Sequence, residues 1–214
     1  MNEVKDLEGV AVLQDNLDLT PLLSLKKLKR LNCHTPTSAF DLATFTDLKV
    51  LGITYNKYVG NIASCKNLTW LWIDNLKQDD LSCLSSLTNL TKLNLFKTGI
   101  TSLQGIEPLN KLQFLNIDTA NQLQSLEGLT QNNSSLEVLS VYNAPKLTDY
   151  KPLENLANLK KLFLGKTGDM ENLDFVNKTA KLEEVNLGIR VADGNMTNLR
   201  SVKKVALLTS LIIT

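Results

Sequence analysis

Aliphatic residues recur along this chain in a six-residue frame, L-x-x-L-x-L, whose clearest copy places Leu90, Leu93 and Leu95 in register. Strand side chains alternate between two faces, so Leu93 and Leu95 predict a short strand with one buried face. A return segment follows, marked by aliphatic residues at three-residue spacing: Leu103, Ile106 and Leu109. Such spacing is typical of 3₁₀ or irregular structure. One such unit cannot bury its own leucines and needs a copy on each side.

The chain supplies these copies at steps of 20 to 24 residues. Seven clear copies begin at Leu48, Leu68, Leu90, Leu112, Leu136, Leu159 and Leu182, and weaker copies begin at Leu7, Leu28 and Val202. We number frame positions from the first leucine, so that positions one, four and six are aliphatic. About ten stacked units therefore predict a solenoid with a parallel sheet, in which ten strands extend over about 43 Å.

The unbroken repeat predicts a single domain over residues 1–214. Residues 1–27 form a degenerate first repeat, 28–201 the main repeats, and 202–214 a terminal incomplete repeat. Neither end shows a polar cap, and VALLTSLIIT at 205–214 is apolar. Because an open end exposes leucines and an unpaired strand edge, we expect a trimmed chain or self-association through the ends.

Positions three, five and seven of each frame should project from the strands into solvent. Six of the twelve aromatic residues of the chain occupy these positions, and Tyr55 lies beside them. The predicted partner-binding strip comprises Trp70, Trp72, Phe96, Phe114, Tyr142, Phe163 and Tyr55, with Asp74, Lys92, Asn94, Asn116 and Asp118 as polar neighbours. Six half-exposed rings would offer about 450–750 Å², enough for a protein-binding patch. The alternative is that the rings cover one another and stiffen the sheet.

The sequence offers little material for catalysis. His34 is the single histidine, and its neighbour Cys33 should point to the opposite face of the strand. The scattered cysteines predict no metal site, and no phosphate-binding glycine loop appears. Asp79–Asp80 and Glu183–Glu184 are interpreted as solvated charges. We therefore expect a protein that is not an enzyme and needs no cofactor.

A formal net charge of +1 gives no electrostatic footprint for nucleic acid. No apolar run reaches the ~20 residues that cross a bilayer, and the first residues lack the apolar core of a signal peptide. The expected location is the cytoplasm for the chain as given, or the cell surface or exterior if it is a fragment of a longer protein. Cys33, Cys65 and Cys83 are interpreted as reduced, mostly buried thiols rather than a disulfide framework.

Units such as LTKLNLFKTGITSLQGIEPL and LEVLSVYNAPKLTDYKPLENL resemble leucine-rich repeats of the short, bacterial, internalin-like class. The resemblance implies an α/β fold: a curved, right-handed solenoid with a parallel β-sheet on its concave face and short 3₁₀ or irregular segments on its convex face. It also implies recognition of a protein through the concave face.

The sequence departs from internalins in lacking their signal peptide, helical N-terminal cap, immunoglobulin-like extension and regular asparagine ladder. Asn56 occupies a ladder place, but the equivalent places hold Thr98, Ala120, Ala144 and Thr167. Threonine hydroxyls or close backbone packing should replace the ladder.

Three functional hypotheses follow. The first is a non-enzymatic module that binds a protein or peptide through the aromatic strip. The second is an intracellular regulator or inhibitor-type binding protein. The third is a structural spacer within a longer bacterial surface protein, with no ligand on the concave face.

Overall fold

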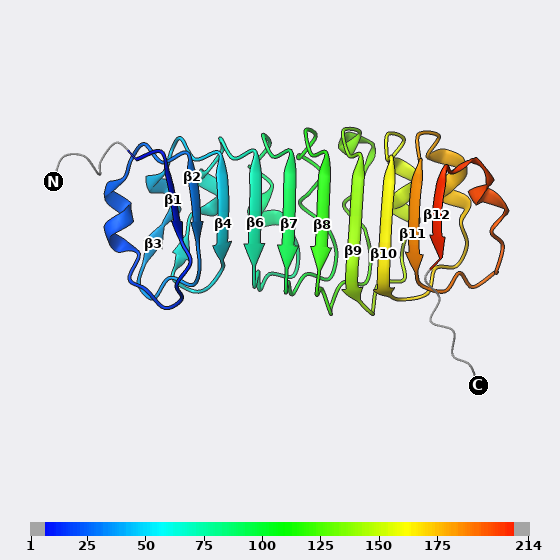
Figure 1. The fold of residues 1–214 in the computed structure, drawn as a ribbon, viewed down its shortest axis with the longest axis horizontal. Helices are drawn as coiled ribbons and strands as arrows, with labels where there is room; N and C mark the ends of the chain where they lie inside the picture. The colour runs from blue at the N-terminus through cyan, green and yellow to red at the C-terminus, as the bar shows by residue number, and fades with distance from the viewer. Residues whose placement is uncertain (1–6, 208–214) are drawn as a thin grey trace.

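A computed structural model describes residues 7–207 of the chain (Figure 1). Within these residues one sheet contains ten parallel strands in the order β1-β2-β4-β6-β7-β8-β9-β10-β11-β12. The strands are β1 (Gly9–Val12), β2 (Arg30–Cys33), β4 (Val50–Thr54), β6 (Trp70–Asp74), β7 (Lys92–Phe96), β8 (Phe114–Asp118), β9 (Val138–Ala144), β10 (Lys161–Thr167), β11 (Glu184–Gly188) and β12 (Lys204–Leu207). Each strand lies beside the next one in the repeat, as the frame predicts.

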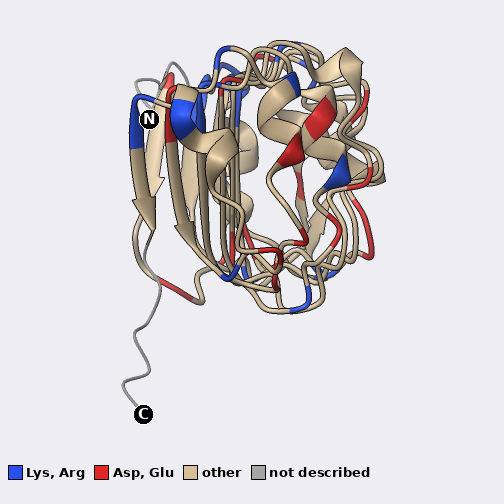
Figure 2. Cartoon of the chain, turned by 90° about the vertical axis from the view of Figure 1, so that its right-hand side faces the viewer, with Lys and Arg blue, Asp and Glu red and all other residues tan. Residues whose placement is uncertain are grey.

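Short 3₁₀ helices occupy the return segments and form the side of the solenoid opposite the large sheet (Figure 2). They are η2 (Thr20–Ser24), η3 (Leu42–Thr44), η4 (Ile62–Ser64), η5 (Ser82–Leu84), η6 (Gln131–Asn133), η7 (Lys151–Asn155), η8 (Asp174–Lys178) and η9 (Thr197–Ser201). A second, two-stranded parallel sheet joins β3 (Phe40–Asp41) to β5 (Val59–Gly60). The leucine frame did not predict this small sheet, because its residues lie between two copies of the frame.

The strand register confirms the frame across all ten units. Cα partners in neighbouring strands are the position-three residues of successive repeats: Gly9, Arg30, Val50, Trp70, Lys92, Phe114, Val138, Lys161, Glu184 and Lys204. A slip of one residue would move every leucine of a strand to the other face. The buried aliphatic positions therefore fix the register.

Positions one, four and six form the core of the solenoid. Leu93 and Leu115 are both fully buried, because the repeats on each side cover them. The outermost units differ: Leu7 is 42% exposed and Val205 is 41% exposed. The position-seven residue of the last unit, Leu208, lies outside the described residues, as does most of the apolar 205–214 segment.

A left-handed residue turns the chain away from the sheet after several strands. Position eight has a positive φ in five successive units, at Asn75, Lys97, Thr119, Asn143 and Lys166. Asparagine tolerates this conformation, whereas a β-branched residue such as threonine adopts it only under strain. The turn lets the next residues pack under the strand ends.

The asparagine ladder is replaced at these turns as the sequence predicts. Asn56 Nδ2 donates to the Pro36 carbonyl at 2.9 Å. At the equivalent place the Thr98 hydroxyl donates to the Leu76 carbonyl at 3.2 Å, while Ala120 is buried without a polar side chain. Hydroxyl bonding and close backbone packing thus share the role.

A second set of asparagines links the repeats before the strands begin. Asn67, Asn89 and Asn158 each precede the first leucine of a frame. Their side-chain amides donate to backbone carbonyls of the preceding repeat at 2.8, 3.0 and 2.7 Å. The recurring Asn-Leu pair therefore has a structural role, since it satisfies carbonyl groups between repeats.

Candidate protein-binding face

The solvent side of the large sheet consists of positions three, five and seven of the ten units, and we call it the sheet face. Strand alternation puts every residue of the predicted aromatic strip here except Tyr55, which follows the end of β4. The strip runs over neighbouring strands from β6 to β10. The sequence therefore identified which side chains share a face.

The aromatic rings are less exposed than the sequence predicts. Trp70 is 46% exposed, whereas the other rings of the strip are only partly exposed: Trp72, Phe96, Phe114, Tyr142, Phe163 and Tyr55. The expectation of six half-exposed rings is therefore wrong in magnitude. The accessible apolar surface of the strip is centred on Trp70.

Contacts between the rings and the sheet explain this burial. The Trp72 and Phe96 rings pack at a centroid distance of 5.5 Å with a tilt of 42°. Tyr142 lies over Gly165 of the next strand so closely that a Cβ there would come within 2.5 Å of the ring. Part of the strip thus stiffens the sheet, which is the role that the alternative interpretation gives it.

The predicted polar neighbours differ in their contacts and in their burial. Lys92 Nζ lies 5.8 Å from the centroid of the Trp70 ring. Asp118 accepts hydrogen bonds from Asn143 Nδ2 at 2.7 Å and from the Thr119 hydroxyl at 3.1 Å. Asn94 and Asn116 are Cα partners on β7 and β8 and are half-buried.

Asp74 is the least satisfied polar side chain on the face. Its Oδ2 atom lies 3.8 Å from Lys97 Nζ. Its Oδ1 atom is buried and has no hydrogen-bond partner. A buried acceptor without a donor lowers the stability of the folded state.

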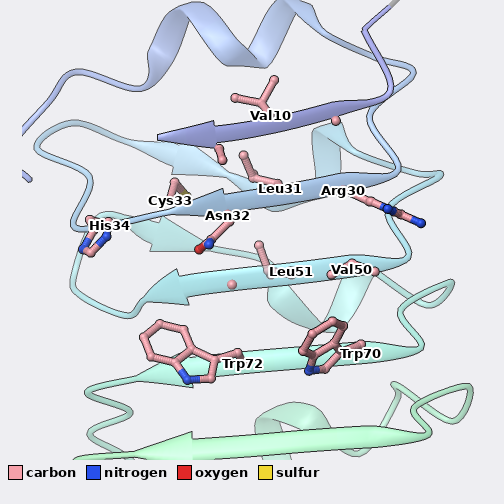
Figure 3. Close-up of a pocket in the computed structure, with 13 residues that line it drawn as sticks. Val10, Arg30, Leu31, Asn32, Cys33, His34, Val50, Leu51, Trp70 and Trp72 are labelled. Atoms are coloured by element: carbon pink, nitrogen blue, oxygen red, sulfur yellow. The ribbon is translucent and has the colours of Figure 1, made fainter. Parts of the chain in front are cut away.

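A hollow of about 680 Å³ lies on the sheet face beside the two tryptophans (Figure 3). Gly9, Ala11 and Gly52 line it together with Val50, and these small side chains leave the space open. Its further lining comes from Arg30, Asn32, His34, Trp70 and Trp72 and from Val10, Leu31, Cys33 and Leu51. Four residues of this lining were not predicted as site residues: Arg30, Asn32, Val50 and Gly52. The available signal was a run of small residues at outward positions near Trp70 and Trp72.

Tyr55 lies apart from the rest of the strip. It borders a different hollow of about 480 Å³, together with Asn56, Lys57, Val59, Asn75, Lys77 and Gln78. Its backbone N–H donates to the Asp74 carbonyl at 2.7 Å. Tyr55 is therefore at the carboxyl ends of the strands rather than on the sheet face.

The histidine and cysteine side chains point apart, as strand alternation predicts. Cys33 is buried in the core, whereas His34 Nδ1 lies 3.2 Å from Asp15 Oδ1 at the surface. All three cysteines are free thiols. Burial raises the pKa of Cys33 to about 12 and that of Cys65 to about 11, and it also raises the pKa of Cys83.

The neighbouring carboxylates Glu183 and Glu184 separate in the same way. Glu183 pairs with Lys203 at 2.7 Å, and Glu184 pairs with Lys161 at 3.1 Å. Across residues 7–207 no group of three or more His, Cys, Asp or Glu side chains could hold a metal ion. In the same range no helix is both long and apolar enough to cross a membrane.

Comparison with known proteins begins at the level of sequence. No protein-family model matches the chain. Eighty residues, or 37% of the chain, are 35% identical to a probable disease resistance protein of Arabidopsis thaliana, of which they cover 9%.

Two solved structures from Listeria monocytogenes share the architecture. An internalin (inlF) has a TM-score of 0.73 at 22% identity, over 90% of this chain and 57% of that one. An internalin C2 (inlC2) has a TM-score of 0.69 at 21% identity, over 86% of this chain and 82% of that one. This chain thus spans little more than half the length of the inlF structure. The likeness establishes the fold: a leucine-rich repeat solenoid of the internalin-like form.

Proposed function

We propose that this protein is a non-enzymatic binding module that recognises a protein or peptide partner through its sheet face. The observation that carries the proposal is the exposure of Trp70, 46%, on the face of a sheet beside a hollow of about 680 Å³. Tryptophan at the centre of a partly apolar surface is typical of binding hot spots. Leucine-rich repeat solenoids also offer an extended surface suited to a protein partner.

The partner-binding residues are proposed to be the strip identified from the sequence, with Trp70 as the main anchor. The Trp72 and Phe96 rings pack against each other across β6 and β7, and Lys92 lies over the Trp70 ring. The more distant members, Phe114, Tyr142 and Phe163, extend the surface toward β10. Their partial burial suits a contact surface that is already ordered before binding.

A paired pull-down from lysates of the source organism and of candidate hosts tests this function. The baits are the wild-type protein, a Trp70→Ser/Trp72→Ser variant and a Tyr58→Ser variant. Tyr58 is 38% exposed and lies between β4 and β5, away from the sheet face, so it controls for the loss of an exposed ring. Circular dichroism confirms that all three baits are folded.

A protein retained by the wild type and Tyr58→Ser, and lost with the tryptophan variant, would support the proposal. Equal capture by all three baits would contradict it and favour the spacer hypothesis. Capture of a single catalytic protein whose activity falls on binding would favour the alternative of an intracellular regulator.

A further inference from the structure

Two basic residues lie at the ends of the row of side chains that crosses the hollow beside the tryptophans. The position-three residues of β2, β4, β6 and β7 are Cα partners from each strand to the next. They are Arg30, Val50, Trp70 and Lys92. Two cations thus flank two apolar residues along one row. Both cationic side chains are exposed.

Neither cation forms an ion pair with a carboxylate of the described residues. Farther along the same row, by contrast, Lys161 pairs with Glu184 at 3.1 Å. On the opposite side of the hollow, His34 Nδ1 lies 3.2 Å from Asp15 Oδ1. Arg30 lines the hollow, and Lys92 lies just outside its lining with Nζ 5.8 Å from the centroid of the Trp70 ring.

The centre of the hollow has room for a large side chain. Gly52 is buried beneath Asn32, because a Cβ at position 52 would lie 2.7 Å from Asn32 Oδ1, so the open space of the hollow lies beside Asn32. Asn32 projects into the lining of the hollow from the neighbouring strand β2 (Figure 3). The Trp70 and Trp72 side chains form the adjacent wall.

The spacing of the cations specifies the shape of the partner. Arg30 and Lys92 are three strand steps apart, which is about 14 Å. In an extended peptide, residues i, i+2 and i+4 point to one side and span about 14 Å. An extended segment crossing the strands could therefore place two carboxylates over the cations and one side chain over the hollow.

We propose that the hollow receives a large apolar side chain from an extended segment of the protein partner, with an acidic residue two positions before it and another two positions after it. The carboxylates pair with Arg30 and Lys92, and the apolar side chain packs against Trp70 beside Asn32. This inference rests on the proposed function and names the chemistry of the segment that this part of the sheet face recognises.

Selection from a phage-displayed library of random linear peptides on the folded chain tests the proposal. We expect enrichment of sequences with the order acidic, any, apolar, any, acidic. One enriched peptide is then synthesised and titrated against protein variants by fluorescence anisotropy. Gly52→Leu, which displaces Asn32 and fills the hollow, and Arg30→Glu/Lys92→Glu, which reverses the charge of both cations, should each weaken binding at least tenfold.

Matched controls separate these effects from general changes in charge or folding. Lys204→Glu alters an exposed position-three cation at the far end of the sheet and should leave the affinity unchanged. Ala11→Leu fills the same hollow from β1 if Gly52→Leu fails to fold. A peptide with lysine in place of both acids should prefer the Arg30→Glu/Lys92→Glu variant over the wild type.

Several outcomes would overturn the proposal. These are a library with no enriched sequence, enrichment without the acidic spacing, and full binding to both hollow-filling variants. Dimerisation of the free protein that Gly52→Leu abolishes would assign the hollow to a second copy of this chain. If binding of the natural partner requires Trp70 and Trp72 but is unaffected by substitution of Gly52, Arg30 or Lys92, this inference fails while the proposed function stands.

Discussion

At the scale of single residues, the solenoid depends on leucines that neighbours cover from both sides. Leu115 is fully buried on β8 and is the Cα partner of Leu93 on one side and Leu139 on the other. A rigid neighbour on each side prevents the sheet from closing over a cavity. The cost of truncation is therefore large.

Replacing Leu115 by alanine should lower the free energy of unfolding by about 2–5 kcal/mol. Leu13→Ala is the control, because Leu13 is 75% exposed, and its effect should stay within about 0.5 kcal/mol. Urea denaturation followed by circular dichroism measures both. Equal effects for the two variants would contradict the assigned register.

Burial of the thiols makes the free energy of unfolding depend on pH, and the direction of the pKa shift gives the direction of that dependence. Burial raises the pKa of Cys33 from an ordinary 9.0 to about 12. Above pH 9 the unfolded chain loses this proton while the native state keeps it, so the unfolded state binds fewer protons. The stability that this thiol contributes is complete below pH 9 and is lost as the pH rises toward 12.

The Cys33→Val variant should therefore lose less stability with rising pH than the wild type does. The difference in slope should approach about 1.4 kcal/mol per pH unit above pH 9. Urea denaturation at several values between about pH 8 and pH 10.5 measures it. Comparison with the wild type removes the contribution of other groups, such as Tyr150, whose pKa burial raises to about 12. Identical slopes would mean that the Cys33 thiol ionises in the native state as readily as in the unfolded chain.

At the scale of elements, glycines set how closely successive return segments approach each other. Gly105 has a φ of +92°, and a Cβ there would lie 2.4 Å from the backbone nitrogen of Ser82 on η5. Gly128 has a φ of +110°, and a Cβ there would lie 2.2 Å from the carbonyl oxygen of Leu103. Both the conformation and the contact require the absence of a side chain.

Gly105→Ala should consequently destabilise the protein by at least about 2 kcal/mol, through left-handed strain and the clash with η5. Gly60→Ala is the matched control, since no atom lies within 4 Å of a Cβ at that place. Its effect should range from neutral to slightly stabilising. Thermal melting compares the two variants, and a larger loss for Gly60→Ala would refute the packing described for the return segments.

At the scale of the whole molecule, each repeat contacts mainly its two neighbours. Stability in such a stack is a sum over repeats and their interfaces, so the ends open more easily than the middle. Within the described residues β1 and β12 are the outer strands, and every residue of β12 is exposed.

Hydrogen exchange followed by mass spectrometry should show this gradient. We expect the slowest exchange in β7, β8 and β9 and the fastest in β1 and β12. Leu115→Ala should accelerate exchange in the central strands more than at the ends. Uniform protection along the stack would instead indicate cooperative unfolding of the entire solenoid.

The sequence by itself determined the repeat, the register and the identity of the outward-facing residues. Because strand side chains alternate and leucine is buried, Leu93, Leu95 and their equivalents must all face the core. The same logic separated Cys33 from His34 and placed Trp70 and Trp72 on one face. The prediction that residues 1–27 and 202–214 form degenerate terminal repeats follows from the same frame.

The tertiary structure alone decided how exposed each outward side chain is. Exposure depends on what the adjacent strand carries, as with Tyr142 over Gly165 or Trp72 against Phe96, and these neighbours are more than twenty residues apart in the chain. The hollow beside Trp70 arises for the same reason, because Gly9, Ala11 and Gly52 meet only when three repeats stack. A linear pattern gives the direction of a side chain, whereas its accessible surface is a property of the assembled sheet.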